Sequence, residues 1–190
     1  MKDVNDEVSL RLKKLFKLQT WGDTYELTDK EETDVAGISI FEKILSQEEF
    51  GERFLSFAVE IRSVERLQDY YREEAKFLSL YQDLFNSFSI YISKHDPEYS
   101  NDSGDPYNFD DSMEPLIWKT FESKEEFIDV CTDSLREKEF MHLFIPDLEL
   151  MIFGSYDLEE CVVFQSDKGK DAFKGYVERH GLFLLGLKKS

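Results

Sequence analysis

The sequence contains few of the residues from which common functional motifs are built. Glycine occurs nine times in 190 residues, cysteine twice and histidine three times. There is no G-x-x-x-x-G-K-[ST] or G-x-G-x-x-G phosphate-binding loop, and no G-x-S-x-G nucleophile turn. None of the histidines has a second histidine or cysteine two to four positions away, which is the spacing of a metal pair. The sequence therefore indicates no catalytic motif, and we expect no cofactor and no metal.

Long apolar runs are also missing. The longest apolar stretches lie around 150–153 and 182–187, whereas a membrane-spanning helix needs about 20 residues. The first residues, Met1 to Glu7, include acids where a signal peptide has a basic segment followed by an apolar one. We therefore expect a cytoplasmic protein in which Cys131 and Cys161 are buried, reduced thiols.

Positive charge is scarce. Lysine and arginine number 23 against 41 aspartates and glutamates, which gives a formal net charge of −18. Residues 20–167 hold 12 basic and 36 acidic side chains, a net charge of −24, whereas both ends are slightly basic. This balance argues against binding to nucleic acid or to an anionic membrane. It is consistent with a solubilising surface, or with electrostatic attraction of a basic protein partner.

Aromatic residues are abundant, which indicates a folded protein. The chain has 17 Phe, 9 Tyr and 2 Trp, and these residues supply apolar surface that disordered chains lack. The length fits one domain that spans residues 1–190.

Helical patterns dominate the first two thirds of the chain. A loose apolar stripe predicts a helix within 4–18, and two S-x-x-E capping boxes, at Ser46 and Ser123, predict the starts of two more. The strongest periodicity, over 64–88, predicts a long amphipathic helix. Its expected apolar stripe consists of Val64, Leu67, Tyr71, Ala75, Leu78, Tyr81, Phe85 and Phe88.

Strand-like patterns follow in the last third. Short apolar runs at 140–145, 148–153 and 161–165 predict strands, the last two as an antiparallel hairpin, and such runs are normally covered on both faces. A helix over 168–180 with Gly181 as its left-handed cap, then a strand over 182–187, complete the pattern. Residues 21–28 also fit a short strand. We expect an α+β fold in which a helical N-terminal half packs on a small, mainly antiparallel C-terminal sheet.

An acidic segment at about 95–118 interrupts this pattern. It has seven acids and no lysine or arginine, and its prolines and glycine predict a long irregular loop. Aromatic residues beside charges often anchor protein interfaces, so we expect this loop to contact a basic protein partner. The alternative interpretation is that Tyr107 and Phe109 hold the loop against its own core. The candidate partner-binding residues are Asp102, Asp105, Tyr107, Phe109, Asp110 and Asp111.

The histidines fit structural roles better than catalytic ones. His180 precedes the helix-capping Gly181, where the helix dipole favours a cation, and His142 lies in an apolar strand. His95 opens the acidic loop, where a solvated position is the simplest interpretation.

The C-terminal part of the chain resembles that of small uncharacterised bacterial proteins, some of which are thought to be toxin immunity proteins. The residues that carry the resemblance are Leu150 to Asp157, Cys161 to Phe164 and His180 to Leu185. Proteins of the immunity type are small, cytoplasmic and often acidic, and they bind a toxin domain tightly without performing chemistry.

Three functions remain open at this stage. We expect a non-enzymatic inhibitor of the immunity type, which covers the active site of a basic toxin domain. The alternatives are an enzyme with a dispersed carboxylate site and a structural or regulatory subunit that docks through the helix over 64–88. The identity of the partner and the oligomeric state stay open.

Overall fold

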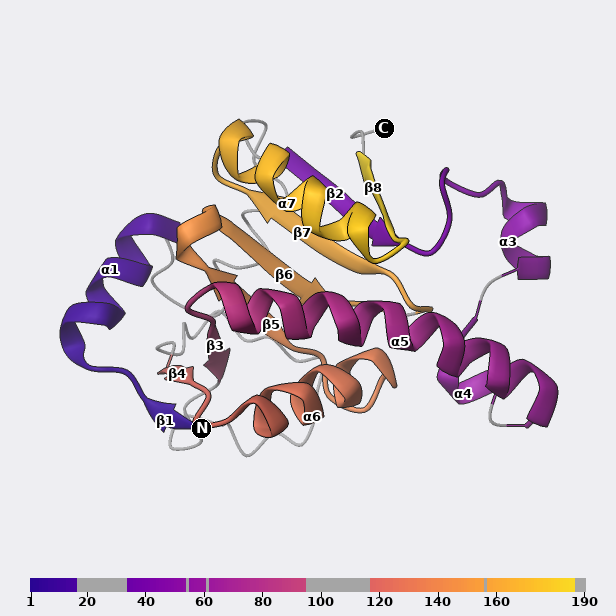
Figure 1. The fold of residues 1–190 in the computed structure, drawn as a ribbon, viewed down its shortest axis with the longest axis horizontal. Coiled ribbons are helices and arrows are strands. Elements are labelled where there is room, and N and C mark those ends of the chain that lie inside the picture. The colour runs from indigo at the N-terminus through magenta and orange to yellow at the C-terminus, as the bar shows by residue number, and fades with distance from the viewer. Residues whose placement is uncertain (17–33, 54, 61, 95–116, 156, 187–190) are drawn as a thin grey trace, which may run out of the picture.

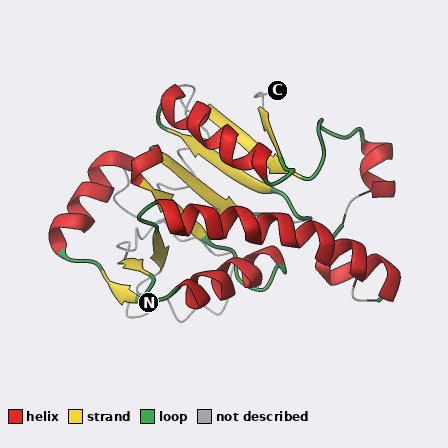
Figure 2. Ribbon diagram, viewed as in Figure 1, coloured by secondary structure: helices red, strands yellow, loops and turns green. Residues whose placement is uncertain are grey.

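The computed structural model describes residues 1–16, 34–53, 55–60, 62–94, 117–155 and 157–186. Helices and one eight-stranded antiparallel sheet confirm the α+β class (Figure 2). The helices are α1 (Asp6–Phe16), α3 (Gln47–Arg53), α4 (Phe57–Glu60), α5 (Val64–Ser87), α6 (Lys124–Leu135) and α7 (Asp167–Arg179). The strands are β1 (Lys2–Asp3), β2 (Asp34–Ser39), β3 (Tyr91–Lys94), β4 (Ile117–Thr120), β5 (His142–Ile145), β6 (Leu150–Gly154), β7 (Glu160–Phe164) and β8 (Phe183–Gly186).

The sheet draws its strands from both halves of the chain. Its order is β1-β4-β3-β5-β6-β7-β2-β8, so the early strand β2 lies between the two late strands β7 and β8 (Figure 1). The expected division into a helical N-terminal half and a small C-terminal sheet therefore agrees only roughly with the structure. Strands β1 to β4 were not predicted from the sequence, and β4 begins at Ile117, within the end of the loop expected at about 95–118. The strand considered at 21–28 lies outside the described residues.

Each face of the central sheet has its own core. On one face, α5, α6 and α7 cover alternate strand residues such as Leu143 and Ile152. On the other face, Leu12 and Phe16 of α1 pack on Phe144 and its neighbours, and the rings of Phe16 and Phe144 are 5.2 Å apart. The prediction that the apolar strands are covered on both faces is confirmed for β5, β6 and β7.

Capping hydrogen bonds confirm the two helix starts that the sequence predicted at Ser46 and Ser123. The hydroxyl of Ser46 accepts from the backbone N–H of Glu49 at 3.3 Å, and the Glu49 carboxylate accepts from the Ser46 N–H at 3.1 Å. The Ser123 hydroxyl accepts from the Glu126 N–H at 3.2 Å in the same way. The helix that begins after Ser46 is short, however, because α3 ends at Arg53 and a separate turn, α4, follows.

The long helix α5 is present, but its predicted apolar stripe is wrong by about one position. The buried residues of α5 are Tyr70, Glu74, Phe77, Leu80, Tyr81 and Leu84. From the expected stripe, only Tyr81 is fully buried, whereas Val64 is 78% and Tyr71 41% exposed. Leu78 and Phe85 are half-buried.

The C-terminal elements agree with the prediction. Strands β6 and β7 form the antiparallel hairpin, α7 follows, and Gly181 has a left-handed backbone with φ 68°. Cys131 is buried and Cys161 half-buried, and both thiols are free. Among the described helices, none has the length and apolar character needed to span a membrane.

Candidate functional site

The six residues predicted to bind a partner lie outside the described residues, because the structure describes nothing between Lys94 and Ile117. These are Asp102, Asp105, Tyr107, Phe109, Asp110 and Asp111. The acidic loop therefore stays a prediction, and the candidate surfaces below come from the described parts of the chain.

One outer face of α6 and of the turn before it is strongly acidic. Residues 122–135 contain five acids and a single cation, Lys124. Four of these acids lie within α6, and at 100° per residue they fall within roughly 100° of one another around the helix axis, whereas Glu122 lies just before the N-cap Ser123. We call this surface the α6 ridge; it consists of Glu122, Glu125, Glu126, Asp129 and Asp133.

The α6 ridge faces away from the core. The buried residues Phe127, Cys131 and Leu135 occupy the opposite side of α6, under α5 and over the sheet. Glu122, Glu125 and Asp129 are exposed. The N-terminal ammonium of Met1 pairs with Glu126 and lies 3.8 Å from Glu122, and Lys138 pairs with Asp133 at 2.6 Å at the other end of the ridge. Among the described residues, Glu125 and Asp129 are the ridge carboxylates left without an ion pair. A row of carboxylates on a rigid helix can attract a basic protein surface from a distance.

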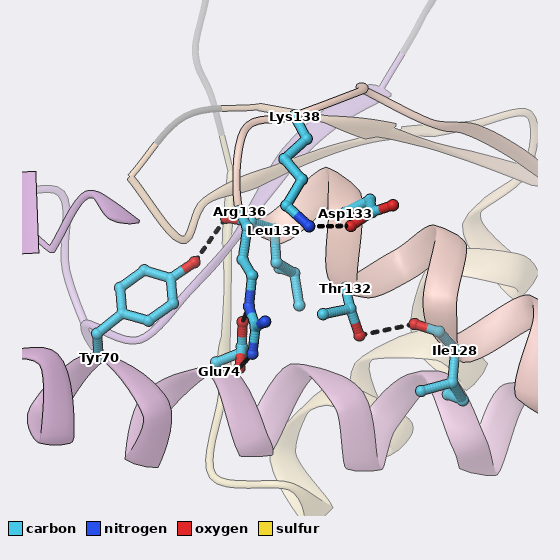
Figure 3. A network of polar contacts seen from close by, with 8 residues as sticks. All are labelled: Tyr70, Glu74, Ile128, Thr132, Asp133, Leu135, Arg136 and Lys138. Carbon is cyan, nitrogen blue, oxygen red and sulfur yellow. Dashed lines mark hydrogen bonds and ion pairs between the residues drawn. The ribbon is translucent and has the colours of Figure 1, made fainter. Parts of the chain in front are cut away.

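An ion pair between a buried carboxylate and a partly exposed guanidinium joins α5 to the end of α6. The guanidinium of Arg136 donates to both carboxylate oxygens of Glu74, at 2.7 and 2.9 Å (Figure 3). The hydroxyl of Tyr70 donates to the carbonyl oxygen of Leu135 at 2.6 Å, one turn away along α5. Because the side chain of Glu74 is only 4% exposed, its charge depends on Arg136 for compensation.

Carboxylates and unusual backbone angles meet beside this ion pair. Glu137 and Asp157 have positive φ angles of 58° and 62°, which are uncommon outside glycine. The Glu137 carboxylate accepts from the Ser56 hydroxyl at 3.0 Å and from the Asp157 N–H at 3.4 Å. Burial, followed by the negative charges of Glu137 and Glu159, raises the pKa of Asp157. Strained backbone of this kind concentrates at functional sites, which makes the cluster a second candidate.

The most unusual single group is Glu160, the first residue of β7. Its side chain is 1% exposed, and neither carboxylate oxygen has a partner with regular hydrogen-bond geometry. Burial raises the pKa of Glu160 to about 8, although the nearby hydroxyl of Tyr81 and the backbone of Ser155 favour the charged form. Glu160 is therefore protonated at neutral pH. Being enclosed by Tyr81 and Cys131, it offers no open acid–base site.

The two described histidines, His142 and His180, lie apart from this carboxylate, and His95 lies outside the described residues. His142 is 7% exposed, and its ring is 5.1 Å from that of Phe153. Strand register puts His142 and Phe153 on the same face as Cys161, and therefore on the face opposite Glu160. His180 is the C-cap residue of α7, and Gly181, which was expected to be the cap, follows it; the Nε2 of His180 lies 3.2 Å from Asp83. Among the described residues, no group of three or more His, Cys, Asp or Glu side chains could hold a metal ion.

The thiols are held in the unreactive form. Burial, with a smaller contribution from the charge of Glu160, raises the pKa of Cys161 to about 11. Burial also raises the pKa of Cys131. A thiol with a raised pKa has little thiolate at neutral pH, so neither cysteine is a nucleophile in this environment.

No protein-family model, no curated protein and no solved structure matches the chain. The functional proposal therefore rests on the residues and the geometry of the chain itself.

Proposed function

We propose that this chain is an acidic, cytoplasmic binding protein of the immunity type, which neutralises a basic toxin domain by occluding its active site. The observation that carries the proposal is the concentration of negative charge, −24 over residues 20–167, with part of it fixed on the exposed α6 ridge. Enzymes that act on nucleic acid have basic active sites, so a carboxylate-rich surface can compete with the phosphates of their substrate.

The ridge suits this role because its geometry is fixed before the partner arrives. The α6 helix is held by the buried residues Phe127 and Cys131, by the Ser123 cap and by the pairing of Met1 with Glu126. A preorganised surface loses little conformational entropy on binding. The resemblance of residues 150–185 to small bacterial proteins of the immunity type supports the same proposal, as does the acidic loop at about 95–118.

The enzyme alternative has weaker support. Its best candidate acid is Glu160, because this carboxyl is desolvated and protonated at neutral pH. A general acid must reach a substrate, however, and Glu160 lies under α5 and α6. The structure therefore supports a binding protein better than it supports an enzyme that uses Glu160.

The test begins with the partner. Tagged protein is used as bait in lysate of its source organism, at low and moderate salt, and the captured proteins are identified by mass spectrometry. The proposal predicts one stoichiometric basic partner whose own activity falls when the purified chain is added at equal concentration. A captured partner that keeps full activity in the complex would contradict the inhibitory role.

Matched charge variants then locate the contact. The ridge variant is Glu125→Lys with Asp129→Lys, and the control is Asp171→Lys with Glu178→Lys on α7, which changes the net charge by the same amount at exposed positions. A loop variant carries Asp→Asn changes at 102, 105, 110 and 111. Weaker inhibition by the ridge or loop variant, but not by the control, would support the proposed contacts. Equal inhibition by all variants would contradict them.

A further inference from the structure

A small cavity lies on the face of the sheet that points away from α5, α6 and α7. Ala36 and Val162 pack in the core under those helices, so their strand neighbours Gly37 and Cys161 point to the opposite face. The cavity has a volume of about 180 Å³. Strands β2, β7 and β8 and the segment that leads into α3 line it, through residues that include Gly37, Cys161, Leu185, Ile44, Leu45 and Phe50.

The strand register explains why a hollow forms at this place. Gly37 pairs with Cys161 of β7 on one side and with Leu185 of β8 on the other. Because glycine has no side chain, the middle of this cross-strand row stays unfilled. Ile44 and Phe50 border the hollow and are exposed, and none of the residues of α3 is buried. The cavity therefore has an apolar lining that these side chains do not fill.

A carboxylate with a fixed position borders the same cavity. Glu159 lines it, and its Oε1 accepts a hydrogen bond from the hydroxyl of Ser39 at 3.3 Å. Ser39 is buried in β2, and its hydroxyl also accepts from the N–H of Phe41 at 3.1 Å, which holds the hydroxyl in place. Among the described residues, Glu159 has no ion pair, and the described lining of the cavity contains no lysine or arginine. Its negative charge is therefore uncompensated beside apolar surface.

Two neighbouring carboxyls add to the negative charge at this place. Burial, followed by the charges of Glu137 and Glu159, raises the pKa of Asp157. The three carboxyls are therefore close enough for the charge of one to disfavour the ionised form of another. A cation that pairs with Glu159 relieves this repulsion.

We propose that this cavity binds a small organic cation, a protonated amine on an apolar body. The apolar body lies against Ile44, Phe50 and Leu185, and the ammonium group pairs with Glu159. Pockets for drug-sized ligands have volumes of about 300–1,000 Å³, so this smaller cavity fits a single ring or a short alkyl chain. The site is independent of the proposed inhibitory function, because α6 lies on the other face of the sheet.

Titration with phenethylamine, followed in proton–nitrogen NMR correlation spectra, tests the proposal. The amide signals of Gly37, Ser39 and Leu185 should shift and saturate. Phenethyl alcohol has the same shape without the charge, and ethylamine has the charge without the ring. Each of these controls should bind about threefold or more weaker than phenethylamine. Equal shifts with ethylamine would show only general attraction to a chain of net charge −18, and would overturn the proposal, as would the absence of saturable shifts.

Two pairs of variants locate the site. Glu159→Gln should raise the dissociation constant of phenethylamine about threefold or more, whereas Glu178→Gln on α7, which changes the net charge equally, should leave it unchanged. Ile44→Ser removes apolar lining and should also weaken binding, whereas Leu10→Ser on α1, which replaces another exposed aliphatic residue, should not. All four replace exposed side chains, and circular dichroism checks that they stay folded. Equal affinities for a variant and its control would overturn the site.

A further probe separates a free amine from the same group on a protein. N-acetyl-lysine methylamide presents a lysine side chain as a protein does, without a ring. It should bind more weakly than phenethylamine, because its body covers less of the apolar lining. Tighter binding of this probe would assign the cavity to a protein side chain and overturn the proposal of a free amine.

Discussion

Glu160 lies beside the phenol of Tyr81 with both carboxylate oxygens buried and no regular hydrogen bond to either of them. Burial raises the pKa of both side chains, that of Glu160 to about 8. The two groups join β7 to α5, so the protonation of one carboxyl is coupled to the packing of the long helix on the sheet. A buried acid of this kind makes stability depend on pH.

Stability should fall as pH rises from about 4.5 to about 8. In this window the folded chain keeps the proton on Glu160, whereas the unfolded chain, with a glutamate pKa of 4.5, has released it. A rise in pH therefore favours the unfolded chain up to pH of about 8. Above that pH, the contribution of Glu160 to the free energy of unfolding no longer changes. Glu160→Gln cannot ionise, so the variant should lose this slope and exceed the wild type in free energy of unfolding at pH 8. Urea denaturation at several pH values measures the effect.

The control for this experiment is Glu159→Gln, which removes a carboxyl from the exposed neighbouring residue. It should keep the slope of the wild type. Parallel pH profiles for wild type and Glu160→Gln would mean that burial does not raise the pKa of Glu160, and would contradict this account.

Removal of Arg136 should destabilise the fold strongly. Arg136→Met keeps apolar contact with Phe57 and Tyr71, whose rings lie 5.3 and 5.2 Å from the guanidinium, but leaves the charge of Glu74 buried without a partner. We expect a loss of about 3 kcal/mol in the free energy of unfolding. Adding Glu74→Met should recover most of it, because the double variant buries no charge.

The matched control is Lys138→Met, two residues away. Lys138 pairs with Asp133 at 2.6 Å, but both side chains are about half exposed, so we expect a change below about 1 kcal/mol. Chemical denaturation compares the variants. A similar loss in the free energy of unfolding for Arg136→Met and Lys138→Met would show that the pair between Glu74 and Arg136 stabilises the fold no more than an exposed ion pair does.

Two glycines of α7 should respond in opposite directions to alanine. A Cβ atom at Gly169 would overlap the carbonyl oxygen of Leu148, whereas one at Gly175 meets nothing within 4 Å. We expect Gly169→Ala to cost about 1–3 kcal/mol through overpacking. We expect Gly175→Ala to stabilise the helix by about 0.5–1 kcal/mol, because alanine loses less backbone entropy than glycine. Thermal denaturation of both variants tests the placement of α7, and equal effects would contradict it.

Local signals in the sequence predicted where helices begin and end better than they predicted which strands pair in the sheet. The capping boxes at Ser46 and Ser123 and the cap at Gly181 depend on neighbouring residues alone, and all three are present. Strand β2 was missed because its two neighbours in the sheet, β7 and β8, are more than 100 residues away in the chain. Gly37 also weakens the strand pattern of the segment.

The face of α5 was misassigned for a physical reason. Its apolar arc is wide, and Glu74 lies at one edge of the buried side, where a charged residue argues against burial. Arg136, 62 residues away, compensates this charge, and no local pattern shows the pairing. The residues assigned to the core instead include Val64 and Tyr71, which are both exposed.

The candidate surfaces were only partly predictable. Helical spacing alone places the acids of the α6 ridge on one face. Alternation along β7 also puts Glu160 on the side of Val162 and Phe164, which was a usable signal for its burial. Its position beneath Tyr81 depends on how α5 crosses the sheet, and this arrangement is not contained in any local stretch of sequence.

The most direct test of the central claim is the association rate constant with the captured partner, measured by stopped-flow fluorescence as a function of ionic strength. Electrostatic steering by carboxylates predicts fast association at low salt, a steep fall as salt rises, and a clearly lower rate for the variant with Glu125→Lys and Asp129→Lys than for the α7 control. An association rate that is independent of salt and equal in the two variants would contradict the proposal that the acidic surface recognises a basic partner.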